Sequence, residues 1–265
     1  MTIRRRRRCD NEKSELKDSM NSKTGLIPCR DEGEGEDEVI DMDFEELINI
    51  IRNTNESRES IDYSPFIIKK GVAKDVCQTL EKFDEYASWA VWDKDGRFDY
   101  KSTKIDLKTG CVLVAYNPST KSKDPSTGKK IPWGSFHKMN KNNTLVANDT
   151  KLKNAILGTR LSGCYITDII KSRCESKSES VKNSLTEEEI EENVDVFLNE
   201  MTALGNVSLL VAIGNDTFSL LTENPRINDQ YKIIKIPHYS ARKYNNSEDY
   251  VTDVRNSLKK YGLAD

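Results

Sequence analysis

Four short segments of the chain are dominated by apolar residues, and they constrain the fold more than any other feature of the sequence. A strand that is apolar on both faces is typical of a parallel sheet that helices cover on both sides. Segments with helical spacing alternate with these strands along the chain. We therefore predict an α/β fold, a three-layer α/β/α sandwich with a four-stranded parallel sheet. The predicted strands are residues 111–116, 163–170, 208–213 and 231–236.

The first part of the chain differs in composition from the rest. Residues 4–8 are a run of arginines and residues 31–46 are strongly acidic, whereas large apolar residues are few. Such a segment cannot offset the entropy cost of folding, so we predict a largely disordered charged tail over residues 1–60 and one folded domain over 61–265. The arginine run could bind phosphates, act as an import signal or remain solvated. Residues 43–52 have helical spacing and could dock on the domain or bind a protein partner.

Cysteine usage and hydropathy indicate the compartment. The six cysteines are scattered, without a CxxC pair or a Cys/His cluster, which indicates reduced thiols and no zinc site, iron–sulfur cluster or other cofactor. No run of about 18 apolar residues is present, and no apolar segment follows the N-terminal arginines as it would in a secretory signal. We expect a monomeric cytoplasmic or nuclear protein without a membrane segment.

Polar side chains follow the predicted strands. Because the carboxyl ends of parallel strands share one edge of a sheet, we expect these side chains to gather where open α/β sheets bind their ligands. The chain has only two histidines, His137 and His238, and both lie in segments assigned to this edge. For the polar end of residues 163–170, a plain strand cap is the alternative. The gathered residues would be Asn117, Ser119, Thr167, Asp168, Asn215, His238 and Ser240.

Five short motifs follow one another between residues 111 and 240. They are VLVAYNPS at 112–119, PWGSFH at 132–137, GCYITDIIKSR at 163–173, LLVAIGNDTFSLL at 209–221 and KIPHYS at 235–240. In this order they resemble the uracil-DNA glycosylase superfamily. The resemblance implies the fold predicted above and an enzyme that flips a nucleotide out of DNA and hydrolyses the bond between base and sugar, as in DNA repair. The chain departs from the family pattern in several places. Ala115 and Ser119 replace glycines of the first motif, the cluster-binding cysteines of the thermophile-type branch are missing, and the last motif, normally HPS, is HYS.

The resemblance also implies roles for individual residues. Asn117 would position the attacking water, and His238 would stabilise negative charge on the departing base. An amide cannot accept a proton, so we expect slower turnover than in an enzyme with aspartate at this position. Either Trp133 or Phe136 would stack on the base. The base-binding residues would be Tyr116, Trp133, Phe136, Thr167 and Asp168, and the DNA-binding residues Ser119, Ser240, Arg242 and Lys243.

Asp168 stands where the thermophile-type branch has an asparagine that reads the edge of uracil. An amide donates to O4 of uracil and accepts from N3–H, whereas an ionised carboxylate only accepts. It would therefore repel O4 and suit the exocyclic amine of cytosine. Our hypothesis is that the substrate is cytosine, a modified pyrimidine or another damaged base rather than plain uracil. The alternative is that Asp168 caps a helix and Thr167 faces the base.

Two other functions fit the same residues. A non-catalytic binder of nucleic acid or nucleotides is favoured by the altered glycines and by Asp168, and a nucleosidase acting on small nucleotides is a further alternative. The expected partner is DNA, either double- or single-stranded, although the net charge of −3 gives no indication of it. A lysine-rich loop could neutralise phosphates or be an ordinary solvated loop. Its lysines are Lys121, Lys123, Lys129, Lys130, Lys138 and Lys141.

Overall fold

The computed structural model describes residues 70–98, 105–119, 131–140, 142, 144–175, 178–244 and 246–265. The predicted charged tail, its arginine run, the segment 43–52 and the boundary at residue 61 lie outside the described residues, so the division of the chain stays a prediction. Of the lysines in the loop after the first motif, Lys138 is described. The others, Lys121, Lys123, Lys129, Lys130 and Lys141, lie outside the described residues.

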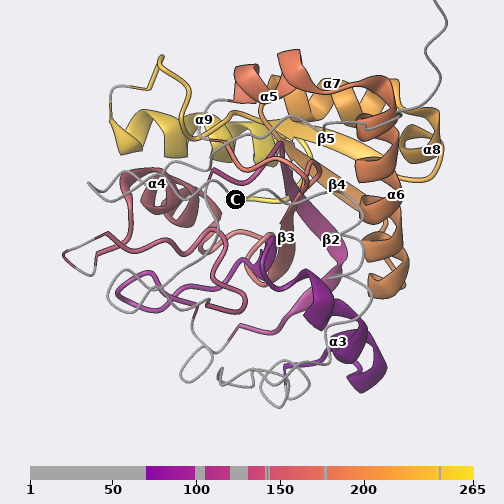
Figure 1. The fold of residues 1–265 in the computed structure, drawn as a ribbon. Helices are drawn as coiled ribbons and strands as arrows, with labels where there is room; N and C mark the ends of the chain where they lie inside the picture. Colours follow the sequence, from indigo (N-terminus) through magenta and orange to yellow (C-terminus); the bar gives the residue numbers. More distant parts are fainter. Residues whose placement is uncertain are drawn as a thin grey trace, which may run out of the picture.

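A five-stranded sheet forms the centre of the domain (Figure 1). Its strands are β1 (Ala87–Trp89), β2 (Lys108–Ala115), β3 (Cys164–Asp168), β4 (Leu209–Ile213) and β5 (Lys232–Ile236). They lie in the order β1-β3-β2-β4-β5, and all pairs are parallel except β1 with β3. The predicted α/β fold with four parallel strands is confirmed. The antiparallel edge strand β1 is an addition to the predicted sheet. Alternation at residues 89–92 indicates a strand, but a strand of three buried residues carries no signal for its pairing with β3.

Helices cover both faces of this sheet, which gives the three layers. They are α3 (Lys74–Leu80), α4 (Ala147–Ile156), α5 (Ser178–Ser184), α6 (Glu187–Leu204), α7 (Asn215–Glu223), α8 (Pro225–Asn228) and α9 (Ser247–Lys259). Buried residues of α3, α5, α6, α7 and α8 share one core with the sheet, and those of α4 and α9 share the other. No helix in the described part of the chain is long and apolar enough to cross a membrane.

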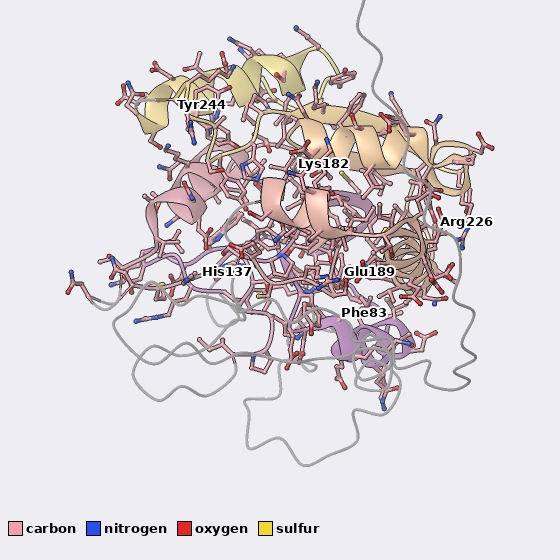
Figure 2. All side chains as sticks on the ribbon, turned by 45° about the horizontal axis from the view of Figure 1, so that its top comes forward. Phe83, His137, Lys182, Glu189, Arg226 and Tyr244 are labelled. Atoms are coloured by element: carbon pink, nitrogen blue, oxygen red, sulfur yellow. The ribbon has the colours of Figure 1, made fainter. Side chains whose placement is uncertain are left out.

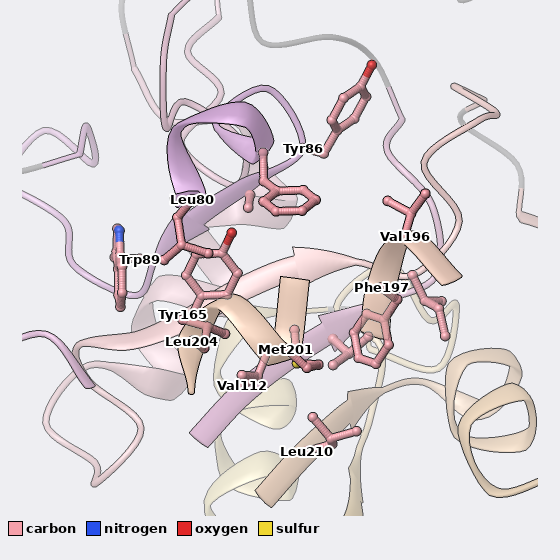
Figure 3. Packing of buried hydrophobic residues seen from close by; sticks show 14 of the residues in the cluster. Leu80, Tyr86, Trp89, Val112, Tyr165, Val196, Phe197, Met201, Leu204 and Leu210 are labelled. Atoms are coloured by element: carbon pink, nitrogen blue, oxygen red, sulfur yellow. The ribbon is translucent and has the colours of Figure 1, made fainter. Parts of the chain in front are cut away.

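Alternate residues of each central strand face the two helical layers. Val112 and Tyr165 pack in the core under α6 (Figure 3). Their neighbours Leu113 and Ile166 pack in the core under α4 and α9. Because successive side chains of a strand point to opposite faces, the position of a residue in β3 decides which layer its side chain meets. This rule governs the end of β3, where two polar residues follow each other.

Helix α6 begins at the capping box that its sequence predicts. The Thr186 hydroxyl accepts the Glu189 N–H at 3.1 Å, and the Glu189 carboxylate accepts the Thr186 N–H at 2.8 Å. The helix ends at Gly205, whose φ of 81° lies in the left-handed region. These two ends satisfy backbone groups that a helix would otherwise leave without partners. They also fix where the helix begins and ends, and therefore the position at which Glu200 of α6 contacts β3.

Candidate active site

The polar residues that follow the parallel strands lie along one edge of the sheet. Ala115 at the end of β2 is in register with the last residue of β3. Ile213 at the end of β4 is likewise in register with Ile236 at the end of β5. Since all four strands are parallel, the residues that come next leave the sheet on the same side. Among them, Asn117, Asp168 and His238 have functional groups that could take part in binding or catalysis.

His238 is held as a neutral imidazole with its proton on Nε2. Its Nδ1 lies 3.1 Å from the backbone N–H of Ser240 and 2.8 Å from the Ser240 hydroxyl. Because a backbone N–H can only donate, Nδ1 must accept, and the proton of the neutral ring is on Nε2. Burial lowers the pKa of His238 to about 4, although nearby Asp216 opposes this shift. The ring of Tyr239 lies against it, with centroids 4.3 Å apart. The geometry thus offers an Nε2–H donor at neutral pH.

Asn117 is oriented by its amide nitrogen. Nδ2 donates to the carbonyl oxygen of Pro118 at 3.0 Å and to that of Glu175, in the loop after β3, at 2.7 Å. Both protons of the amide are therefore used by the backbone. The carbonyl oxygen Oδ1 has no donor among the described residues, and the side chain is half-buried. Asn117 presents an acceptor that can orient a water molecule.

Asp168 is buried without a hydrogen-bonded partner for its carboxyl group. The residue is 3% exposed, and within the described chain its hydrogen bonds involve only its backbone oxygen. Burial raises the pKa of Asp168 to about 8, with Lys171 opposing the shift and Glu200 and Asp149 adding to it. Lys171 is not a true counterion, because its amine lies 2.9 Å from Glu200 and donates to the Asp168 backbone. Burial and the two acidic neighbours thus favour the protonated, uncharged form of this carboxyl group.

Thr167, a predicted base-binding residue, is fully buried and is bonded into a polar cluster against α6. Its hydroxyl donates to Glu200 Oε1 at 2.9 Å, and the Tyr165 hydroxyl donates to the same oxygen at 2.8 Å. Lys171 completes this fully buried cluster through its ion pair with Glu200. Thr167 and Tyr165 lie on the α6 side of β3, whereas Asp168 lies on the other side.

The aromatic island at 132–137 is also divided between the two faces. Trp133 is 2% exposed and packs against Trp89 and Tyr165, with ring centroids 6.4 and 6.3 Å apart. Its ring is thus packed in the core, and its base-binding role stays a prediction. Phe136 is 9% exposed and belongs to the core that contains Ile166, on the side of Asp168. Both Trp133 and Phe136 have left-handed backbones, with φ of 59° and 65°, a strain typical of functional loops.

His137 is a structural residue, contrary to its predicted place at the ligand edge. Its ring nitrogens lie 3.3 Å from the Gly96 oxygen and 3.2 Å from the Trp89 oxygen. The ring packs against Trp92 and Phe98, with centroids 5.2 and 5.7 Å away, and burial lowers the pKa of His137 to about 4. In Figure 2 it lies away from Tyr244, which marks the region of α9. Both ring nitrogens thus face backbone carbonyls rather than a ligand.

A match between the sequence and a family model identifies the family of the chain. The polar residues at the carboxyl edge of the sheet lie within the matched segment. The model of the Uracil DNA glycosylase superfamily matches residues 102–260, which is more than half of the chain. The chain belongs to the uracil DNA glycosylase superfamily. The match runs from before β2 to the end of α9 and so contains every residue of the edge. No curated protein matches the chain.

Two buried acidic residues of this superfamily domain were not predicted to lie near the site. Asp149, in the first turn of α4, accepts the backbone N–H of Lys138 at 2.9 Å, and burial raises its pKa to about 6. Glu200 could have been found, because it lies three residues after Phe197 and four before Leu204, on the apolar face of α6. A charged residue on such a face requires a buried partner. No cluster of three metal-ligating side chains occurs among the described residues.

Tyr116 lies on the α6 side of the sheet, next to the start of α7. It belongs to the same core as Trp133. Its pKa is raised by burial and by nearby Asp216. Asp216 also forms an ion pair with Lys182 of α5 at 3.0 Å (Figure 2 labels Lys182). Tyr116 therefore lies on the face of the sheet that α7 covers, opposite to the face of Asp168.

The residues predicted to contact DNA lie on the surface of the superfamily domain. The Lys243 amine is 3.0 Å from Asp253 and 4.5 Å from the centre of the Tyr244 ring. Arg242 makes no ion pair with any other described residue, so its charge is open to a phosphate. All four predicted residues are exposed: Ser119, Ser240, Arg242 and Lys243.

Gly214 positions His238, and its replacement provides a test. Its φ is 96°, and a Cβ atom on it would lie 3.0 Å from the His238 Cβ. Gly214→Ala should cost about 1–2 kcal/mol of backbone strain, and by displacing the imidazole it should slow base release roughly tenfold or more. Gly205 is a matched control, because its φ is 81° and a Cβ atom on it would meet nothing within 4 Å.

Thermal unfolding and single-turnover base release measure the two effects separately. Gly205→Ala should lower the unfolding temperature through the strain of its own positive φ and leave base release unchanged. Equal losses of base release in the two variants would contradict a positioning role for Gly214.

Proposed function

We propose that this protein is a DNA glycosylase that hydrolyses the N-glycosidic bond of a pyrimidine flipped out of DNA. The observation that carries the proposal is His238, a half-buried neutral imidazole whose Nε2–H is available because the Ser240 N–H occupies Nδ1. A neutral donor fixed in position is suited to an oxygen on which negative charge develops. Membership of the superfamily supports the same reaction class.

The reaction breaks the bond between C1′ of the sugar and the base nitrogen. Both electrons of this bond leave with the base, and the sugar passes through an oxocarbenium-like state. His238 Nε2–H donates to the base carbonyl that takes up this charge. Water then forms a bond to C1′, oriented by Asn117 Oδ1, and its proton passes to the base or to solvent. Asn117 orients this water without taking the proton, since an amide is not a general base at neutral pH.

The base and its strand are held by other residues of the same edge. Phe136 would stack on the flipped base, because its ring lies on the side of the sheet that Asp168 faces. Asp168 would read the edge of the base. Exposed Arg242 would bind a DNA phosphate, with Ser119, Ser240 and Lys243 as further contacts.

Base release from oligonucleotides tests the proposal. Single-turnover assays would use otherwise identical duplex and single-stranded oligonucleotides that contain uracil, cytosine or a modified cytosine, with alkaline cleavage of the abasic product as the readout. We expect base release from at least one uracil- or cytosine-containing strand. Tight DNA binding without any release would favour the non-catalytic binder, and release from free deoxynucleosides but not from DNA would favour the nucleosidase.

A further inference from the structure

Asp168 has an environment that does not suit an ionised carboxylate. Four titratable groups surround it: Lys171 after β3, Glu200 of α6, Asp149 of α4 and Tyr239 after β5. The one cation among them is paired with Glu200 at 2.9 Å. Two of the others are acidic, and a negative charge on Asp168 would be repelled by both. The carboxyl group also lacks a hydrogen-bond donor among the described residues.

The position of Asp168 leaves its carboxyl group for a ligand. The residue is 3% exposed and ends β3 two residues after Ile166, so the alternation of the strand directs it to the face of Ile166 and Phe136. Its neighbour Thr167 is bonded to Glu200 on the opposite face and cannot take this role. A buried polar group without a partner is costly unless a ligand satisfies it. Asn117 follows the adjacent strand β2, and His238 follows β5 at the same edge of the sheet, so the ligand that the proposed function places at this edge is a flipped base.

A neutral carboxyl group matches two pyrimidines. Uracil presents an acceptor at O4 beside a donor at N3–H, and cytosine presents a donor at N4–H beside an acceptor at N3. A neutral carboxyl group has one O–H donor and one C=O acceptor, as an amide has. Its proton can lie on either oxygen, however, whereas the donor and acceptor of an amide are exchanged only by turning the group over. An amide fixed in one orientation reads only one of the two bases, and with its NH2 group toward position 4 that base is uracil.

We propose that Asp168 reads the flipped base as a neutral carboxylic acid, and that the site therefore accepts both uracil and cytosine. This inference rests on the glycosylase function proposed above and refines its substrate class. It replaces the expectation from the sequence that an ionised carboxylate would repel uracil. The pKa of about 8 supports it, because a carboxyl group with that pKa is largely protonated at neutral pH.

Measurements of binding to probes that cannot release their base separate recognition of the base from cleavage of its bond. The probes would be oligonucleotides whose target nucleotide carries a 2′-fluorine, which destabilises the oxocarbenium-like state and prevents release. The wild-type protein should bind uracil and cytosine probes within about threefold of each other at about pH 7. Asp168→Asn should keep uracil and lose cytosine by roughly 10- to 100-fold, the range for a mismatched pair of hydrogen bonds. Asp149→Asn, which alters the neighbouring carboxyl group only, should still bind both probes.

The pH dependence provides a second arm. As pH rises from about 7 to about 9, wild-type binding of both probes should fall about tenfold, because the proton of Asp168 is lost. Uracil binding by Asp168→Asn should not show this loss. If cytosine binding strengthens while uracil binding falls, the reader is the ionised carboxylate and the proposal is overturned. It is also overturned if wild type and Asp168→Asn discriminate alike, or if neither base is bound better than an abasic probe.

The two proposals fail in different ways. A protein that binds uracil and cytosine as expected but releases no base from unmodified strands would contradict the glycosylase function and leave the reading of the base in place. A protein that releases base with the same selectivity after Asp168→Asn would contradict the role of Asp168 alone. Urea unfolding of each variant would ensure that the compared proteins are folded.

Discussion

Replacing His238 with alanine should slow base release by about 100- to 1,000-fold, the usual cost of removing one donor to a developing negative charge. The imidazole is half-buried and its Nε2–H is the donor that the tautomer provides. The loss should appear in single-turnover rates, while DNA binding changes little, because the donor acts on charge that forms during the reaction.

The control for this variant is Ser240→Ala. It removes the hydroxyl near Nδ1 but keeps the backbone N–H that fixes the tautomer, so we expect less than about a tenfold loss. Because the pKa of His238 is about 4, the wild-type rate should show no inflection from this group between about pH 5 and pH 8. An inflection near pH 6.5 that disappears in His238→Ala would mean that the imidazole acts by transferring a proton instead.

Replacing Asp168 with asparagine should increase the free energy of unfolding, by roughly 2–4 kcal/mol at about pH 7. The folded-state pKa of about 8 is above the ordinary aspartate value of 3.8, so the folded protein binds this proton more tightly than the unfolded chain does. The stability contributed by the proton is complete below about pH 4 and is lost progressively as pH rises towards 8. The asparagine variant has no proton to lose, so its advantage should grow over this interval.

Urea unfolding at about pH 5, 7 and 9 measures this effect, with Asp149→Asn as the control. The pKa of Asp149 is raised only to about 6, and its Oδ2 accepts the Lys138 N–H, which an amide oxygen can also do. The gain from Asp149→Asn should therefore be smaller and should reach its limit at a lower pH. A wild-type protein as stable as Asp168→Asn at pH 9 would show that Asp168 is not a buried neutral group.

Much of the fold could be predicted because burial leaves a direct trace in the sequence. The apolar runs that became β3, β4 and the second half of β2 are almost entirely buried, and covered parallel strands have that composition. In the edge strand β5 two lysines are exposed and the isoleucines between them are at least partly buried. The start of α6 was predictable from Thr186 and Glu189 alone, since their contact is local. The positions of Asn117, Asp168 and His238 at one edge followed from the parallel order of the strands. The order of the five motifs indicated the uracil DNA glycosylase superfamily.

The parts that could not be predicted depend on contacts between distant residues. In a strand that is buried on both faces, composition does not reveal which of Thr167 and Asp168 faces which layer; the register of β3 against α6 decides it. Trp133 and Phe136 are both aromatic residues in one loop. Both have left-handed backbones, and one ring packs in each core. Because neither residue is a glycine, the sequence does not indicate this conformation.

The two faces of β3 have a consequence for how this protein could change its substrate. Tyr165 and Thr167 fasten the strand to α6 through the carboxylate of Glu200, whereas the side chain of Asp168 fastens nothing. Residue 168 can therefore vary without loosening the strand that carries it. A new base preference could arise by a single substitution, with no compensating change elsewhere, and selection could explore it freely.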